Sequence, residues 1–490
     1  MFGDDIKAKM SVSSIIYGPV RPLLYEPTSG KAAILVFTAC LLFFIGQSLR
    51  IVCFHPLARF PGPPLAIVSN LFYSGTVISG HSHTTIKKLR DNPRKGTNIF
   101  VKNPHFYPTD GTIRAKHIVN TSDPVEHAQI RKMMSHAFSQ KALFEQEDIV
   151  IHYADMLMTA ILDESREGLI DLEMFYNWTT FHVLGELASG EPFGSLEARK
   201  TDNWITIILM MMIKWNAYDF AIHKLPFLPR IQSWLVPKDI AEGAEIHIMQ
   251  SKRKILERMN RPNDRLDFVS YIFKKREEIG ITDWEMTAHA NALVIARSET
   301  TATVVSGLTY WLCRTPRAYE KLKRDVRCTF TSSTEITSRS AMPLTYLTAC
   351  IDEAFRIYPP ISIAMPRKAP AGGETVAGYF VPEGTTVAVH MWSTTHNPKN
   401  FKDPYEYRPE RWMEPNNTDN LDASKPFLLG PRACMGQNMA WMELRILIAK
   451  LVFLFDFKLD DDDFDWDRDS RTFVLWEKPP LMTRVTPRAV

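Results

Sequence analysis

The pattern of apolar positions contains one segment of membrane-spanning length, near the N-terminus. Residues Ala32 to Ile45 are all apolar or small, and with Gln47 to Phe54 they approach the ~20 residues that cross a bilayer. A cleaved signal peptide is the alternative, but the run starts late and no small-x-small cleavage site follows it. We predict an N-terminal tail over 1–30, an uncleaved transmembrane anchor over 31–54 and a proline-rich hinge over 55–64.

Residues 65–490 show a mainly helical pattern without a linker or repeat, so we expect one large domain that is mainly α with a minor β-sheet region. The clearest helix is predicted from Asp283 to about Arg314, with Thr282 as the N-cap of a capping box. Two β-rich runs between Thr375 and His390 flank Pro382-Glu383-Gly384, which predicts a hairpin that turns at those three residues.

Composition and charge narrow the class of protein. The chain has 490 residues, of which 45% are apolar, and a net charge of only +3 from 58 basic and 55 acidic side chains. We expect no nucleic-acid partner, since such proteins show a basic stripe or tract. The six cysteines form no CxxC pair, which argues against a zinc site or a disulfide framework. The acidic run from Asp460 to Asp469 lacks the glycine of a calcium loop and is interpreted as a solvated loop.

One cysteine stands apart because of its neighbours. Residues Phe427 to Gly436 precede an amphipathic helical stretch from about Gln437 to Phe455, which places Cys434 in a glycine-flanked loop at a helix N-terminus. Backbone N–H groups and the helix dipole there favour an anionic sulfur and are expected to lower the thiol pKa. The glycines leave room for a flat cofactor, and Arg432 is placed to meet an anionic group on it. The alternative is a buried, inert cysteine ahead of a helix.

The loop from Phe427 to Gly436 has the pattern FxxGxRxCxG and is similar to the cysteine-ligand loop of the cytochrome P450 family. The resemblance implies the fold of that family and a haem b whose iron is ligated axially by the Cys434 thiolate. A thiolate ligand pushes electron density onto iron and favours O–O cleavage, as insertion of oxygen requires. The resemblance also implies cofactor contacts from four other positions of the loop, namely Phe427, Gly430, Arg432 and Gly436.

Further segments fall in the family's order. Glu353-Ala354-Phe355-Arg356 has the form ExxR on a predicted helix, where the two charged residues at i,i+3 share a face. With Arg411, in a segment that resembles the family's PERF sequence, they are implied to form a salt-bridged triad. An isolated ExxR would be equally well explained as a surface ion pair. The resemblance further implies contacts to the haem propionates from three positions: His127, Arg131 and Arg367.

The long predicted helix carries the sequence Ala296 to Thr301, which resembles the family's (A/G)Gx(D/E)T(T/S). Ala296 and Thr300 share a face. The resemblance implies that the alanine leaves space for dioxygen, that the threonine hydroxyl bonds to it, and that Glu299 relays protons. Arg297 stands where the family has glycine, and a buried arginine needs an anion. We favour a carboxylate on a neighbouring helix; the alternative is an anionic or carbonyl-bearing substrate.

The substrate side is predicted to be apolar. Trp204 to Ile213 is a methionine-rich run, which is either a plain buried helix or, by resemblance, part of the lid over the substrate channel. A lipophilic small molecule is therefore the expected substrate. By resemblance the pocket also draws on the loop before His127, Ala292, Ala296, Ile361 to Met365 and Phe473.

The resemblance implies a fungal, membrane-anchored monooxygenase that tailors terpenoid or polyketide secondary metabolites, through stretches such as Asp110 to Asn120 and Ser135 to Leu143. The chain has no Gly-rich dinucleotide fingerprint, so electrons are expected from a separate NADPH–cytochrome P450 reductase. Its candidate docking face comprises Lys321, Lys323 and Arg324. The alternative is a reductase-independent haem-thiolate isomerase or dehydratase, which would tend to lack the Glu299-Thr300 pair. A third class is a non-catalytic haem-binding sensor.

The expected location is the endoplasmic reticulum membrane, with a single span and a cytosolic catalytic domain. This orientation is inferred from function alone, because the positive charges around the anchor do not support it. Asn120, Asn177 and Asn416 fit the NxS/T pattern of glycosylation, which a cytosolic domain would leave unmodified.

Overall fold

The computed structural model describes residues 28–58, 63, 66, 69–87, 100–107, 115–192, 194–210, 218, 221–222, 238–260 and 280–488. The chain divides into two compact units, Met1–Phe60 and Pro61–Val490. In the first unit, helix α1 spans Thr28–Phe54, and its segment Ala33–Phe54 has a mean hydropathy of 2.0. By length and composition α1 is a candidate membrane anchor. Most of the predicted tail and part of the predicted hinge lie outside the described residues.

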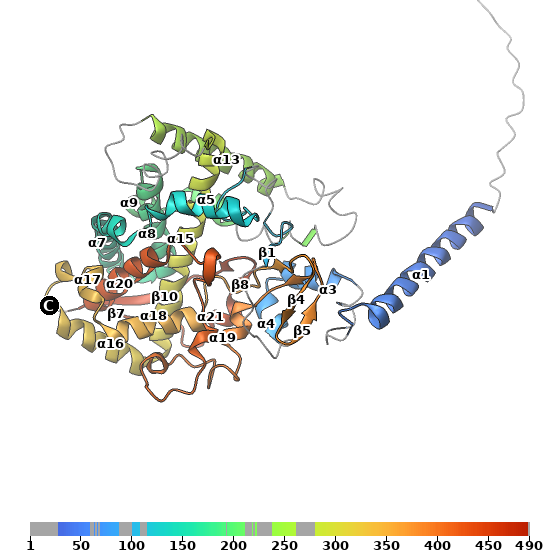
Figure 1. Cartoon of the computed structure of the whole chain (residues 1–490). Coiled ribbons are helices and arrows are strands. Elements are labelled where there is room, and N and C mark those ends of the chain that lie inside the picture. Colours follow the sequence, from blue (N-terminus) through green and yellow to red (C-terminus); the bar gives the residue numbers. More distant parts are fainter. Residues whose placement is uncertain are drawn as a thin grey trace, which may run out of the picture. The chain divides into compact units, whose positions relative to one another are not determined.

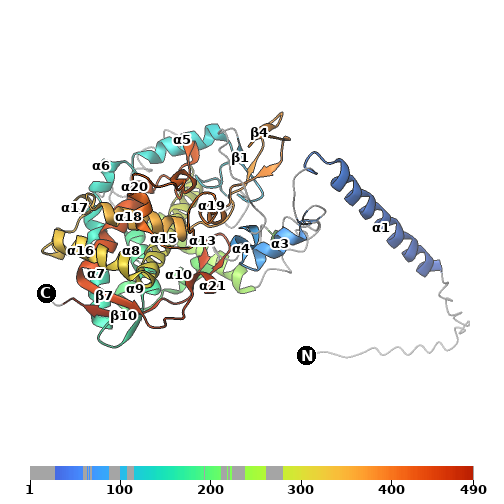
Figure 2. The ribbon, with the colours of Figure 1, turned by 90° about the horizontal axis from the view of Figure 1, so that it is seen from below.

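The second unit is mainly helical (Figures 1 and 2). Its described α-helices are α3 (Leu71–Ile78), α4 (Ser82–Lys87), α5 (Pro124–Ser135), α6 (Gln140–Phe144), α7 (Glu147–Glu164), α8 (Leu172–Ser189), α9 (Ser195–Ala198), α10 (Asn203–Met210), α13 (Lys238–Met259), α15 (Asp283–Arg314), α16 (Pro316–Thr329), α17 (Ser338–Ala341), α18 (Thr345–Ile357), α19 (Met391–Thr395), α20 (Gln437–Leu454) and α21 (Trp466–Asp469). Short 3-10 helices are η3 (Ser333–Glu335), η4 (Pro409–Trp412), η5 (Leu421–Ala423) and η6 (Gly430–Arg432).

The strands are short and form small antiparallel sheets. The three-stranded sheets have the orders β1 (Val101–Lys102), β3 (Arg367–Lys368), β6 (Thr386–Val387) and β2 (Leu169–Asp171), β10 (Met482–Pro487), β7 (Phe455–Leu459). The two-stranded sheets pair β4 (Glu374–Val376) with β5 (Tyr379–Val381) and β8 (Arg471–Thr472) with β9 (Trp476–Glu477). In both views α3, α4 and β4 lie at the end of this unit away from α7 and β7 (Figures 1 and 2). The fold is mainly α with minor sheets, as predicted.

Helix α15 passes through the helical part of the unit, against α8, α13, α18 and α20 (Figure 1). Its capping box is formed: the Thr282 hydroxyl accepts a hydrogen bond from the Glu285 N–H, and the Glu285 carboxylate accepts one from the Thr282 N–H. Its C-terminal half belongs to the main apolar core through Val305, Leu308 and Leu312, each at most 1% exposed. The predicted bounds and cap of this helix are confirmed.

The position predicted for the hairpin turn is wrong. Strands β4 and β5 are joined at Ala377 and Gly378, whose φ angles are 55° and 84°. Two successive residues with positive φ suit a tight two-residue hairpin turn, because such a turn matches the twist of the strands. Gly384, with a φ of 73°, instead turns the chain toward β6, which pairs with β3 in a different sheet.

Three helices bring the sequence motifs into one part of the unit. α18 carries the ExxR segment and α20 follows the Cys434 loop, and both helices contact each other and α15. On α18 one apolar stripe is buried: Leu347, Ile351 and Ala354 are 0% exposed, and Leu344 at the N-cap is partly buried. Helices α15 and α20, more than 100 residues apart along the chain, therefore pack against each other.

Candidate active site

The Cys434 loop is shaped by its own backbone. The Cys434 N–H donates a hydrogen bond of 2.8 Å to the Phe427 carbonyl, and the Ala433 N–H donates one of 3.0 Å to Gly430. Gly430 has a φ of 70°, a left-handed conformation that favours glycine. Gly436 is the N-cap residue of α20, and a Cβ built on it would lie 3.9 Å from the Cys434 sulfur. The loop thus presents an exposed cysteine at the start of a long helix.

The predicted lowering of the Cys434 pKa is wrong for the protein alone. Although the side chain is exposed, protein surrounds it on most sides, and this desolvation raises the thiol pKa. Backbone N–H groups of Gly436 and Gln437 and the charge of Arg131 oppose the rise without reversing it. A bound metal cation would supply the opposing charge, because a thiol that coordinates a metal is deprotonated outright.

Cationic side chains from four separate segments gather near this loop. Arg131 of α5 donates a 2.6 Å hydrogen bond to the Ala433 carbonyl. Arg432 donates to the carbonyls of Thr121 at 2.7 Å and Ser122 at 2.9 Å. The pKa of His127 is lowered to about 4, first by burial and then by nearby positive charges, which come from Arg432, Lys102, Arg131 and Arg367. We call Lys102, Arg131, Arg367 and Arg432 the cation cluster; His127 lies among them but is neutral near pH 7.

The cation cluster fits the carboxylates of haem. Within the described part of the chain, no carboxylate forms an ion pair with Lys102, Arg131, Arg367 or Arg432. Buried polar atoms without a hydrogen-bond partner there include Nη1 of Arg367 and the hydroxyl of Tyr107. Buried cations that lack an anion are unfavourable, so the arrangement requires an anionic ligand. Two propionates at the edge of a flat cofactor meet that requirement.

Sequence reasoning missed Lys102. It lies on β1, and its Cα is the register partner of Arg367 on β3, so two cations stand opposite each other in the sheet. Like charges in that position repel, which an anion between them would relieve. The ammonium of Lys102 donates to the carbonyls of Ile118 and Val119, and burial lowers its pKa to about 7. The available signal was a lysine at the end of the apolar run Ile99 to Val101.

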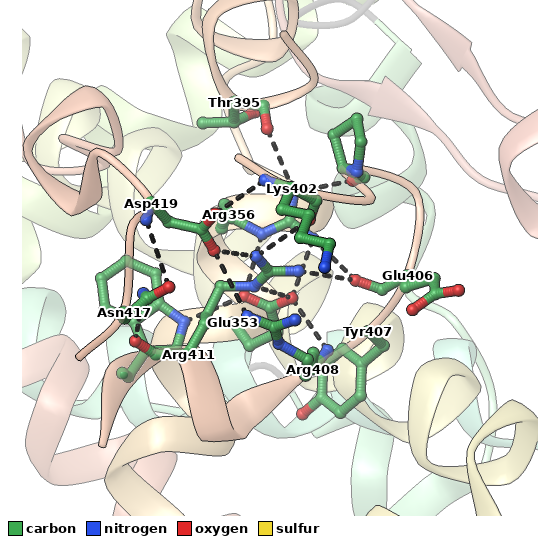
Figure 3. Close-up of polar contacts among 12 residues, drawn as sticks. Glu353, Arg356, Thr395, Lys402, Glu406, Tyr407, Arg408, Arg411, Asn417 and Asp419 are labelled. Carbon is green, nitrogen blue, oxygen red and sulfur yellow. Dashed lines mark hydrogen bonds and ion pairs between the residues drawn. The ribbon is translucent and has the colours of Figure 1, made fainter. Parts of the chain in front are cut away.

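The ExxR pair and Arg411 form one buried network (Figure 3). The Glu353 carboxylate lies 2.8 Å from Nη2 of Arg356 and 3.0 Å from Nε of Arg411, and all three side chains are 0% exposed. Its second oxygen accepts a hydrogen bond of 2.9 Å from the indole of Trp412. The guanidinium of Arg356 also donates to the carbonyls of three loop residues, Thr395, Pro404 and Glu406. The network ties α18 to the loop that precedes Cys434.

A fourth charged group, Asp419, completes this network and was not predicted. Its carboxylate pairs with Arg411 and is 1% exposed (Figure 3). Two carboxylates, those of Glu353 and Asp419, thus face two fully buried guanidinium groups, while the partly exposed guanidinium of Arg408 approaches Asp419 at 3.7 Å from the edge. The buried network is electrically balanced, which a triad of one acid and two bases would not be. Asp419 gave no signal in the sequence, because it lies in the polar run Asn416 to Asn420.

The exposed face of α15 carries the small residue and the alcohol that the sequence predicts. Ala296 is exposed and Thr300 is half-buried, one helical turn apart. The Thr300 hydroxyl donates a 2.8 Å hydrogen bond to the Ala296 carbonyl, so its lone pairs face away from the helix backbone. The hydroxyl can accept a proton or a hydrogen bond from a ligand on this face without disturbing the helix.

Glu299 belongs to a buried charged group of its own. Its carboxylate lies 2.5 Å from Nζ of Lys478, and that ammonium lies 3.0 Å from the carboxylate of Glu173 on α8. Burial raises the pKa of Glu299, and the nearby Glu173 carboxylate adds to the rise, whereas Lys478 opposes it. Two carboxylates share one ammonium, so the group favours keeping one proton. Lys478 and Glu173 were not predicted from the sequence.

Arg297 pairs with a carboxylate on a neighbouring helix, as predicted. Its Nη2 lies 2.5 Å from Oε1 of Glu443 on α20, and its Nε lies 3.4 Å from Oε2. The Thr301 hydroxyl donates to the same carboxylate at 3.3 Å. The guanidinium is directed at α20 and therefore lies away from Glu299, the separation that helical geometry predicts.

The substrate side is described in part. A small recess brings together Ile363, Ala364 and Phe473, which were predicted to line the pocket, with Tyr73, Val77 and Phe106. Ala292 and Ala296 do not line this recess. Of the predicted lid segment, α10 covers Asn203–Met210 and contacts α13, and Ile205 is 0% exposed. Residues 211–213 of that segment and residues 110–114 of the loop before His127 lie outside the described residues.

A cysteine held at a helix N-terminus, a cation cluster that suits two carboxylates, and an alcohol and an acid on an adjoining helix define a haem-thiolate oxidoreductase. Comparison with known proteins places the chain more narrowly. It belongs to the cytochrome P450 family, whose model, described as Cytochrome P450, matches residues 65–485.

Curated relatives from fungi match most of the chain. Cytochrome P450 monooxygenase astJ of Aspergillus oryzae is 33% identical over 469 residues, which cover 89% of this chain and 93% of the relative. Cytochrome P450 monooxygenase ORF9 of Penicillium roqueforti is 35% identical over 507 residues, covering 97% and 98%. Trichothecene C-15 hydroxylase of Fusarium sporotrichioides is 33% identical over 472 residues, covering 89% and 94%. The protein is a cytochrome P450 monooxygenase that binds haem through a cysteine thiolate.

Proposed function

We propose that this monooxygenase inserts one oxygen atom of O2 into a lipophilic small molecule, a terpenoid or polyketide intermediate of a fungal secondary-metabolite pathway. The observation that carries the proposal is the placement of Thr300 on the exposed face of α15 beside the buried acid Glu299. An enzyme that only rearranged its substrate would need neither group. Similarity to a trichothecene hydroxylase supports a lipophilic substrate.

Residues of three kinds would hold haem. Cys434 would ligate the iron. The cation cluster, with neutral His127 as a hydrogen-bond donor, would bind the propionates, a role supported by the lack of carboxylate partners among the described residues. Phe427 packs edge-on against Phe355 at 5.0 Å and would support the cofactor from the thiolate side. Gly430 and Gly436 would let the backbone approach it closely. When bound, haem supplies the redox chemistry, and the thiolate pushes electron density that favours O–O cleavage.

The protein's own contribution to the reaction is to hold and move protons. The Thr300 hydroxyl would accept or pass a proton on the face that Ala296 leaves open. Glu299 would supply that proton from the interior, since its raised pKa favours the protonated form. Lys478 would oppose this rise in the pKa and so allow Glu299 to release its proton. Turnover should therefore depend on all three side chains.

Electrons would come from an NADPH–cytochrome P450 reductase. Of the three residues predicted for the docking face on α16, Lys323 is 15% exposed and pairs with Asp456 at 2.9 Å and with Glu320. We therefore leave Lys323 out of the proposed face. Lys321 lies 3.9 Å from the Glu410 carboxylate, a longer and weaker contact. Arg324 is exposed on the same helix. We propose Lys321 and Arg324 as the docking residues of this face.

Helix α1 would anchor the enzyme in the endoplasmic reticulum membrane by a single span, with the catalytic domain in the cytosol. The three glycosylation motifs are compatible with a cytosolic catalytic domain. Asn120 and Asn177 are 4% and 6% exposed, so the folded domain does not present them as acceptors. Only Asn416 lies in an exposed turn.

The test uses the full chain in microsomal membranes with a fungal reductase. We expect the reduced protein to give with carbon monoxide the red-shifted Soret band of a thiolate ligand, and NADPH and dioxygen to be consumed only with reductase present. Deletion of the gene should cause a less oxygenated lipophilic intermediate to accumulate. Turnover of that intermediate without NADPH or reductase would overturn the proposal in favour of an isomerase or dehydratase.

A further inference from the structure

The ion pair between Arg297 and Glu443 joins two helices inside the protein. The side chains are 12% and 2% exposed, and two nitrogen–oxygen contacts of 2.5 Å and 3.4 Å give a two-point interaction. The Thr301 hydroxyl adds a third contact, to Glu443 at 3.3 Å. Interactions with this two-point geometry restrict orientation as well as distance. The pair therefore restricts the rotation of α15 about its axis and its axial position relative to α20.

The two ends of this pair stand beside the two halves of the haem site. On α15, Arg297 directly follows Ala296, and Thr301 directly follows Thr300. Glu443 lies on α20, whose first residues direct N–H groups of Gly436 and Gln437 at the Cys434 sulfur. A shift of α20 relative to α15 would thus change the distance between the Cys434 sulfur and the Ala296–Thr300 face. No other described ion pair joins these two helices.

Packing alone would allow such a shift. Apart from this pair, α15 and α20 contribute apolar side chains to the same core, and dispersion contacts between such side chains are non-directional and tolerate small displacements. A buried ion pair does not tolerate them, because separation leaves each charge desolvated and unpaired. A charged pair at this position gains little for stability over an apolar pair, so its expected contribution is to the register of the two helices.

We propose that the Arg297–Glu443 ion pair is a positioning device that locks α15 against α20 and thereby sets the distance between the Cys434 sulfur and the Ala296–Thr300 face. The inference rests on the proposed function of the haem site. Arg297 and Glu443 act through the placement of Thr300 and Cys434 and do not themselves touch the reacting atoms.

The test compares Arg297→Met, Glu443→Gln, Arg297→Lys and the charge exchange Arg297→Glu/Glu443→Arg in the full-length holoprotein. Two spectra report the two faces: imidazole binding to the ferric haem probes the Thr300 side, and the carbon monoxide spectrum of the reduced protein probes the thiolate side. The matched control is Lys450→Met, since Lys450 is also on α20, is 1% exposed and pairs with Asp155 of α7. The double variant Arg297→Met/Glu443→Met removes both charges and remains testable if the single variants fail to fold.

We expect each unpaired variant to change the imidazole dissociation constant by about threefold or more and to lower the fraction with the thiolate Soret band, since misplacement of 1 Å has effects up to about 10²-fold. Arg297→Lys or the exchange should recover part of both signals. Lys450→Met should lower the urea midpoint and leave both spectra unchanged. The proposal is overturned if the pair variants, or the double variant, lose stability alone and keep both spectra. Failure of the wild-type protein to give the thiolate band would instead refute the proposed function.

Discussion

The Nζ atom of Lys478 lies 2.5 Å from Oε1 of Glu299, and the two side chains are 3% and 2% exposed. The same ammonium contacts Glu173 at 3.0 Å, so one positive charge serves two carboxylates. Glu299, the acid that the sequence assigns to proton relay, is thus paired inside the protein with Lys478, a residue near the C-terminus. Its ability to take up and release a proton depends on that contact.

Removing Lys478 should disable the relay without removing haem. In Lys478→Met the burial that already raises the pKa of Glu299 is no longer opposed, so the acid stays protonated and ceases to cycle. We expect turnover to fall by about tenfold, less than the ~10²-fold or more that a general acid contributes. The pathway product in the complemented deletion strain and hydrogen peroxide released per NADPH are the measurements. Equal turnover in Lys478→Met and wild type, with Glu299→Gln inactive, would contradict this dependence.

Lys102 should contribute to haem retention. If it faces a propionate, Lys102→Met removes one charge-assisted hydrogen bond, which is worth roughly 1.5 kcal/mol or more and corresponds to about tenfold faster haem loss. Transfer of haem to excess apomyoglobin measures the rate. The control is Lys116→Met, because Lys116 is on the surface and pairs with Glu126. Equal rates of haem loss in the two variants would show that Lys102 does not bind a haem propionate.

Asp419 should be as necessary as the ExxR pair. Asp419→Asn leaves Arg411 buried with one carboxylate shared between two guanidinium groups, and breaking a buried pair costs about 3–5 kcal/mol. We expect loss of soluble, haem-loaded protein. Asp422→Asn is the matched control, since Asp422 is 59% exposed and pairs with Lys425 on the surface, where such a pair contributes at most about 1 kcal/mol. A haem yield unaffected by Asp419→Asn would show that the network does not need charge balance.

Stability should decline in mild acid through His83. Its ring is packed between Trp392 and Trp476, and burial lowers its pKa from 6.5 to about 4. The unfolded chain therefore binds the proton first as the pH falls, so stability present above pH 6.5 is lost toward pH 4. The loss is about 3 kcal/mol at most for this residue. Urea midpoints measured across this pH range should fall less steeply for His83→Gln than for wild type.

The comparison variant for His83 is His152→Gln, because His152 lies exposed on α7. It should keep the wild-type slope of urea midpoint against pH. If His83→Gln and His152→Gln give the same slope, the acid sensitivity arises elsewhere, for example at the buried His247 or His289, whose pKa values are also lowered to about 4.

The site features that could be predicted are those encoded within a short stretch of chain. The capping box of α15 and the face shared by Ala296 and Thr300 follow from helical periodicity, because their members are neighbours in sequence. The same holds for the glycine-flanked loop of Cys434. The hairpin was misplaced for a local reason: Pro382-Glu383-Gly384 reads as a turn, but Ala377-Gly378 is the pair with positive φ.

The sequence by itself determined that this chain has an apolar N-terminal helix and a mainly helical domain with one cysteine suited to bind haem iron. Only the tertiary structure decided which charges meet: Glu443 with Arg297, Lys478 with Glu299, Asp419 with Arg411, and Lys102 beside Arg367. An ion pair depends on the distance between side chains from separate elements, and helical or strand periodicity carries no information about that distance. The residues that tune this site are therefore found in space and not along the chain.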